Sequence, residues 1–127
     1  MRSKPLSFSI TLMLLMWIAV GSALGTIKGS VFDSAEKWVH LAVAIVFWSF
    51  IISRFYRSPL KWSLRVSMLM ILMIAFQNGL WLQAVDDPEL AVTIDRNAWL
   101  RFLGEELTLF VTAVMALIVR RDLHRNQ

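Results

Sequence analysis

Four apolar stretches, each long enough to cross a bilayer as a helix, constrain this chain more than any other feature of its sequence. A helix that crosses the hydrocarbon core needs roughly 20 residues, and positions 7–27, 37–55, 63–84 and 98–119 provide stretches of about that length. No segment alternates apolar and polar residues as a membrane-barrel strand would. The chain is also 57% hydrophobic and only 17% charged. We therefore expect an all-α integral membrane four-helix bundle, forming one transmembrane domain over residues 1–127.

Basic residues are divided unevenly between the two sides that this topology creates. Nine of the thirteen Lys and Arg residues fall in the N-terminal segment, in the C-terminal segment, or in the loop between the second and third spans and the span ends that flank it. The other two loops and the span ends that flank them hold the remaining four, together with six acidic residues. Because cytoplasmic loops carry the excess of Lys and Arg, the bias predicts that both termini are cytoplasmic. We expect the inner membrane of a bacterium, crossed in this N-in, C-in orientation.

The densest basic cluster lies in the loop between the second and third spans and at the two span ends beside it, and it consists of Arg54, Arg57, Lys61 and Arg65. Together with the net charge of +4, such a cluster raises the question of nucleic-acid binding. Its place at the predicted cytoplasmic face favours a topology signal and contact with anionic lipid instead. The lipid bilayer is thus an expected partner, and nucleic acid is not.

The first span carries glycines at four-residue spacing, namely Gly21, Gly25 and Gly29. Small residues at this spacing let helix backbones approach closely, and such packing drives helix association in lipid. The stripe therefore predicts a packing surface of the glycine-zipper kind. Its partner is left open, since the other spans, a second copy of the chain or a different membrane protein would all fit.

Two adjacent carboxylates, Glu105 and Glu106, interrupt the fourth span. Glu105 lies six residues inside Trp99, which at 1.5 Å per residue is a depth of about 9 Å. Glu105 shares a helix face with Thr108, whereas Glu106 points about 100° away, toward the face of Leu109. We therefore expect Glu105 to face the bundle and Glu106 to face lipid or a partner.

Three polar residues on other spans fall at a similar depth, namely His40, Gln77 and Asn78. With Glu105 and Glu106 they predict a polar cluster in the outer half of the bundle. Intramembrane ionisable residues are candidates for function because they are unfavourable in lipid. The cluster would form an outward-opening cavity for a proton, a cation or a polar group. Two simpler alternatives remain: these residues only bond neighbouring helices, or the glutamates lie higher and are hydrated.

Several kinds of chemistry are disfavoured by composition. The absence of cysteine removes disulfides, thiolate metal sites and cysteine nucleophiles. The only histidines are His40 and His124, one in a span and one in the C-terminal tail, whereas haem-binding bundles present paired histidines. No zinc or di-iron spacing is present. We expect no metal and no cofactor, and an enzyme that uses Glu105 or Glu106 as acid or base is the least favoured function.

The chain is similar to the small multidrug transporters in length and span number. Those proteins carry their working glutamate in the first span, whereas positions 7–27 here hold no ionisable residue until Lys28 follows them. The loops are too short to form a soluble active domain. We therefore predict an accessory, regulatory or assembly subunit of a larger membrane complex. The alternative is a homo-oligomeric small transporter or channel that uses the cluster around Glu105.

Overall fold

The computed structural model describes residues 5–28, 34–91 and 96–125, which form helices throughout apart from short connections. The helices are α1 (Leu6–Lys28), α2 (Ser34–Arg57), α3 (Pro59–Asp86), the short α4 (Pro88–Ala91) and α5 (Arg96–Arg125). The prediction of four spans is confirmed to this extent: α1, α2, α3 and α5 are all long and apolar enough to cross a membrane. Each helix contains its predicted span and extends beyond it, because a helix does not have to end at the edge of an apolar stretch.

One residue, Ser58, separates α2 from α3. Its backbone N–H donates to the Arg54 carbonyl at 2.9 Å, and its own carbonyl accepts from the Trp62 N–H at 2.9 Å. Pro59 follows as the first residue of α3, where proline fits well because the first helical N–H has no partner in the helix. Local sequence thus ends one long helix and starts the next without a longer loop.

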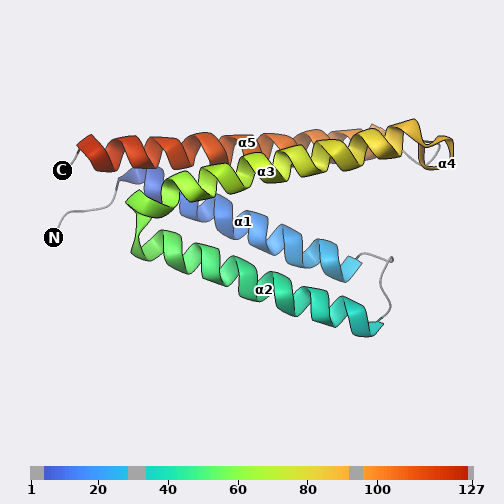
Figure 1. Ribbon diagram of the computed structural model, residues 1–127, viewed down its shortest axis with the longest axis horizontal. Helices are drawn as coiled ribbons and strands as arrows, with labels where there is room; N and C mark the ends of the chain where they lie inside the picture. Colours follow the sequence, from blue (N-terminus) through green and yellow to red (C-terminus); the bar gives the residue numbers. More distant parts are fainter. Residues whose placement is uncertain (1–4, 29–33, 92–95, 126–127) are drawn as a thin grey trace.

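Figure 1 shows where the helix ends lie: α1 begins, α2 ends, α3 begins and α5 ends at the same end of the molecule. We call this the basic end, because it carries Arg54, Arg57, Lys61, Arg65, Arg120 and Arg121. The opposite end is the α4 end. The helix ends that carry most of the basic residues therefore lie together at one end of the molecule, as the charge bias of the sequence requires.

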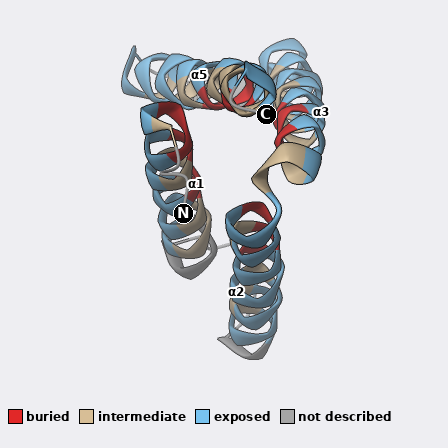
Figure 2. Cartoon of the chain, turned by 90° about the vertical axis from the view of Figure 1, so that its left-hand side faces the viewer, coloured by how far each residue is buried: buried red, intermediate tan, exposed pale blue. Residues whose placement is uncertain are grey.

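The long helices form a ring of neighbours in the order α1, α2, α3, α5 (Figure 2), and the α3–α5 contact is the most extensive. α3 and α5 run side by side along their length, whereas α1 and α2 diverge from them toward the α4 end (Figure 1). The bundle is consequently closed at the basic end and spread at the other.

The buried core occupies the basic-end half of each helix. Its largest fully buried side chains are Phe55, Leu15 and Met70. The rings of Phe8 and Phe55 stack with their centroids 5.2 Å apart, joining α1 to α2. On α1 the buried residues end at Ile18, and among the described side chains beyond it only the partly buried Ala19 packs against the core.

Small residues are buried on the two helices that pack most extensively. On α3 these are Ser63 and Ser67, and on α5 they are Thr112, Ala113 and Ala116. The Ser63 hydroxyl donates to the Leu60 carbonyl at 2.9 Å and that of Thr112 to the Thr108 carbonyl at 2.7 Å, so these hydroxyl donors are satisfied within their own helices. Small side chains permit the close approach that stabilises helix pairs in lipid. Buried serine, threonine and alanine on α3 and α5 thus provide small packing residues of the kind that was predicted for the α1 glycines.

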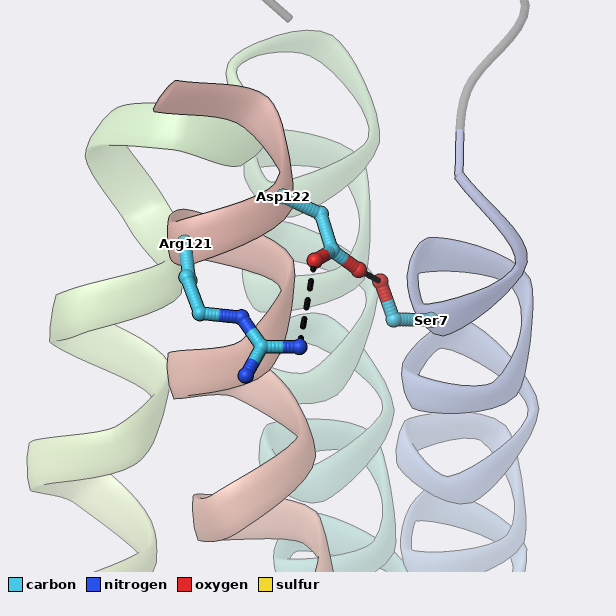
Figure 3. A network of polar contacts seen from close by, with 3 residues as sticks. All are labelled: Ser7, Arg121 and Asp122. Atoms are coloured by element: carbon cyan, nitrogen blue, oxygen red, sulfur yellow. Dashed lines mark hydrogen bonds and ion pairs between the residues drawn. The ribbon is translucent and has the colours of Figure 1, made fainter. Parts of the chain in front are cut away.

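A polar contact fastens α1 to α5 at the basic end (Figure 3). The Ser7 hydroxyl donates to Asp122 Oδ2 at 2.8 Å, and Arg121 lies 3.4 Å from Oδ1 of the same carboxylate. Asp122 is the one acidic residue of the sequence on the predicted cytoplasmic side. It joins helices from the two ends of the chain.

Replacing Ala116 by Leu tests the close contact between helices. Ala116 is fully buried, so the larger side chain is expected to overpack the core and to destabilise the fold by about 1–3 kcal/mol. Ala75→Leu on the exposed face of α3 is the matched control and should leave the melting temperature unchanged. Thermal unfolding in mild detergent measures both, and equal melting temperatures for the two variants would contradict the contact.

Candidate functional site

A cavity of about 500 Å³ lies between α1, α3 and α5, toward the α4 end from the core. It is lined by Trp17, Ile18, Gly21, Ser22, Met73, Gln77, Arg101, Gly104, Glu105, Thr108 and Leu109. Its position follows from the divergence of α1 beyond Ile18. The glycines on α1 and α5 enlarge it, because a Cβ added at Gly21 or Gly104 would meet nothing within 4 Å. We call this the α1/α3/α5 cavity.

A second cavity of about 520 Å³ lies between α3 and α5, nearer the α4 end. Its lining consists of Gln77, Leu80, Trp81, Ala84, Ala98, Arg101, Phe102 and Glu105. Gln77, Arg101 and Glu105 line both cavities. These three residues therefore mark where the cavities meet, which we call the junction.

Two opposite charges stand at the junction without partners. Arg101 and Glu105 are one helical turn apart on α5, a spacing that places their Cβ atoms about 5–6 Å from each other. Both side chains are exposed, and within the described part of the chain neither makes a hydrogen bond or an ion pair. Their formal charges are therefore available to a ligand that enters either cavity.

Two neutral polar atoms beside these charges are buried without hydrogen-bond partners. One is Oε1 of Gln77, an acceptor, and the other is the indole nitrogen of Trp81, a donor. The Trp81 ring stacks on Phe102 at 4.4 Å between centroids and meets Trp99 edge-on at 4.8 Å. This aromatic contact holds α3 against α5 near the α4 end. Buried polar atoms in proteins are generally bonded, so each of these calls for an explanation.

Only part of the predicted polar cluster is brought together. Gln77 and Glu105 share both cavities, as expected from their similar depth. Asn78, adjacent to Gln77 on α3, is exposed and lines neither cavity. His40 is exposed on α2, where its Nδ1 lies 2.8 Å from the Glu36 carbonyl oxygen, and it too lines neither cavity. In the ring of helices α2 neighbours α1 and α3, and it is not among the helices that line the cavity.

Glu106 is placed differently from the sequence expectation. It is more buried than Glu105, and its Oε1 is buried without a hydrogen-bond partner. It lies one turn from Phe102 on the same helix face, and Phe102 stacks on Trp81 of α3. The expectation that Glu106 turns outward is therefore corrected: its face of α5 is directed toward α3.

Sequence reasoning missed Arg101 as a site residue, because it was counted only as a charge near the end of a span. A usable signal existed. Arg101 is four residues before Glu105, so the two had to share a helix face. Trp17 was also missed, since a tryptophan within a span more often indicates helix packing than a cavity wall.

The glycine stripe does not form a close helix contact where the structure describes it. Gly21 is exposed and lines the cavity instead. The surroundings of Gly25, and Gly29 altogether, lie outside the described residues. The prediction of a packing surface therefore does not apply to Gly21 within this chain.

The basic cluster stays at the surface of the basic end. Arg54, Arg57, Lys61 and Arg65 are all exposed. The Arg54 guanidinium lies 5.3 Å from the centre of the Phe50 ring, and that of Arg65 lies 4.8 Å from the centre of the Trp62 ring. These cation–π contacts fix two of the four charges beside aromatic rings.

With regard to metals, no three His, Asp or Glu side chains within residues 5–28, 34–91 and 96–125 lie close enough to hold an ion together.

Replacing Gly21 by Ala tests whether this residue faces open space. A methyl group there meets nothing within 4 Å, and alanine favours a helix over glycine by about 0.5–1 kcal/mol. We expect a small rise in the melting temperature of the purified protein. A clear fall would show instead that Gly21 packs against another copy or another subunit.

Comparison of the chain with protein-family models, with curated proteins and with solved structures finds no match.

Proposed function

We propose that this protein is an accessory or regulatory subunit of a larger complex in a bacterial inner membrane, with both termini in the cytoplasm. It binds a polar group through the junction of its two cavities. The observation that carries this proposal is the unpaired Arg101 and Glu105, which face open cavities in a helix long and apolar enough to span a membrane.

The physical argument starts from the unfavourable free energy of unpaired charges in lipid. Charged side chains in transmembrane helices are rare and normally pair or line polar cavities. Here the basic-end half of the bundle is filled by the core, while the half that holds Arg101 and Glu105 stays open. An external polar group is therefore the natural partner for these charges. The connections between helices are short, so we base the proposed binding site on this cavity.

A homo-oligomeric small transporter is the second candidate function. It is favoured by the arrangement of the two cavities, which share Gln77, Arg101 and Glu105 and so provide adjoining spaces between the core and the α4 end. A solute could pass from one cavity to the other along these residues. Passage beyond the closed basic end would need the core to open.

The proposed orientation follows from the basic end and is testable with reporter fusions. We expect a green fluorescent protein fused after Gln127 to be fluorescent, and alkaline phosphatase at the same position to be inactive. A phosphatase fusion ending at Asp87, after three spans, should be active and serves as the control. Phosphatase activity from the full-length fusion would contradict the orientation.

The subunit and transporter proposals differ in what accompanies the purified chain. From mild detergent we expect a defined complex with a second membrane protein. Its activity or assembly should fall about tenfold or more with Glu105→Gln, since the partner would desolvate a charge pair that includes Glu105, and removing one member of such a pair costs about 2–5 kcal/mol. Asp86→Asn, an exposed carboxylate at the same end, is the control and should have no effect. A homo-oligomer that moves a solute into liposomes only when Glu105 is intact would favour the transporter. Full function of the Glu105→Gln variant in both assays would reject a role for the junction.

A further inference from the structure

The charges at the junction balance each other. Arg101 contributes one positive charge and Glu105 one negative charge, and no other side chain among the described residues that line the two cavities is charged. A ligand with a net charge would pair with one of the two and leave the other uncompensated, which is unfavourable away from water. A ligand with a positive end and a negative end would pair with both.

Two neutral polar groups beside Arg101 and Glu105, in Gln77 of the junction and in Trp81 of the second cavity, fit the same kind of ligand. The buried Gln77 Oε1 is an acceptor without a donor, and the buried Trp81 indole N–H is a donor without an acceptor. An ammonium group can donate both to Glu105 and to Gln77. A phosphate or carboxylate can accept from Arg101, which binds such oxyanions in a bidentate manner, and from Trp81. Donors and acceptors are thus matched, two of each.

We propose that the junction binds a small zwitterion with a primary ammonium at one end and a phosphate or carboxylate at the other. The Cβ atoms of Arg101 and Glu105 are separated by about 5–6 Å, which suits a ligand with its charges a few bonds apart. Cavities of about 500 and 520 Å³ are large enough for such a group. This chemistry occurs in the headgroup of an aminophospholipid and in free glycerophosphoethanolamine, in both of which the single negative charge of a phosphodiester balances the ammonium. The inference rests on the proposed use of the junction for binding.

Binding to the purified full-length protein in mild detergent tests the proposal in two arms. In the lipid arm, native mass spectrometry compares phosphatidylethanolamine with phosphatidylglycerol of the same acyl chains, which carries a net negative charge. In the soluble arm, calorimetry compares glycerophosphoethanolamine with ethanolamine and with inorganic phosphate, each of which carries charge of only one sign. We expect the zwitterion to bind about tenfold or more tightly than its counterparts in at least one arm. Binding in the lipid arm alone assigns a membrane lipid, and binding in the soluble arm assigns a free solute.

Single substitutions test whether Arg101 and Glu105 bind the zwitterion. Arg101→Gln and Glu105→Gln should each weaken zwitterion binding about tenfold or more. Arg96→Gln and Asp86→Asn remove exposed charges at the same end that line neither cavity, and they should leave binding unchanged.

The double variant Arg101→Gln/Glu105→Gln addresses the alternative that the two charges merely pair with each other. It leaves no unpaired charge at the junction, so it should fold with a melting temperature at or above that of the natural sequence while losing zwitterion binding. Retained binding in this variant would overturn the proposal. So would the absence of selective binding in both arms.

The outcomes also separate this inference from the proposed function. If Glu105→Gln impairs the complex or transport but no zwitterion binds, the junction functions with a different ligand and the inference is wrong. If the zwitterion binds through Arg101 and Glu105 but the complex and transport are unaffected by their loss, the ligand assignment stands and the proposed function falls.

Discussion

Direct packing between helix surfaces is the interaction on which the rest of this structure depends. Lipid tails are as apolar as the helix surfaces, so the hydrophobic effect does not drive helices together within a bilayer. Close packing of side chains must stabilise their association instead. The basic-end half provides it through the stacked rings of Phe8 and Phe55 and through small buried residues such as Ser67 and Ala116. Toward the α4 end α1 has no comparable buried residues beyond Ile18, and it separates from α3 and α5.

The same distribution of packing produces the candidate site. α3 and α5 stay together near the α4 end because Trp81 packs against Trp99 and Phe102. α1 is held to α5 at the basic end by the bond between Ser7 and Asp122. The opening consequently lies on the side of α1, and the cavity that results contains Arg101 and Glu105. The open cavity and the closure of the bundle at the basic end are therefore two consequences of one uneven core.

The sequence predicted how far along each span the site residues lie, but it did not predict which way their side chains face. Gln77 and Glu105 were expected together from their distances to the nearby tryptophans, and the structure places both at the junction. Asn78 has nearly the same depth as Gln77, yet one residue of helix turns it about 100° away. His40 also has a suitable depth, but it belongs to α2, which does not line the cavity. Depth follows from counting residues along one helix, whereas direction requires knowledge of which helices are neighbours.

The sequence by itself determined the number, order and approximate extent of the long helices, and it determined which of their ends are basic. Hydropathy and charge suffice for this because they concern each segment and its solvent, independently of the other segments. Only the tertiary structure decided the ring order, the close packing by small residues on α3 and α5 rather than at Gly21, and the pairing of Ser7 with Asp122. Those features depend on complementary shapes and bonding groups of residues distant in the chain, and no single apolar stretch contains that information.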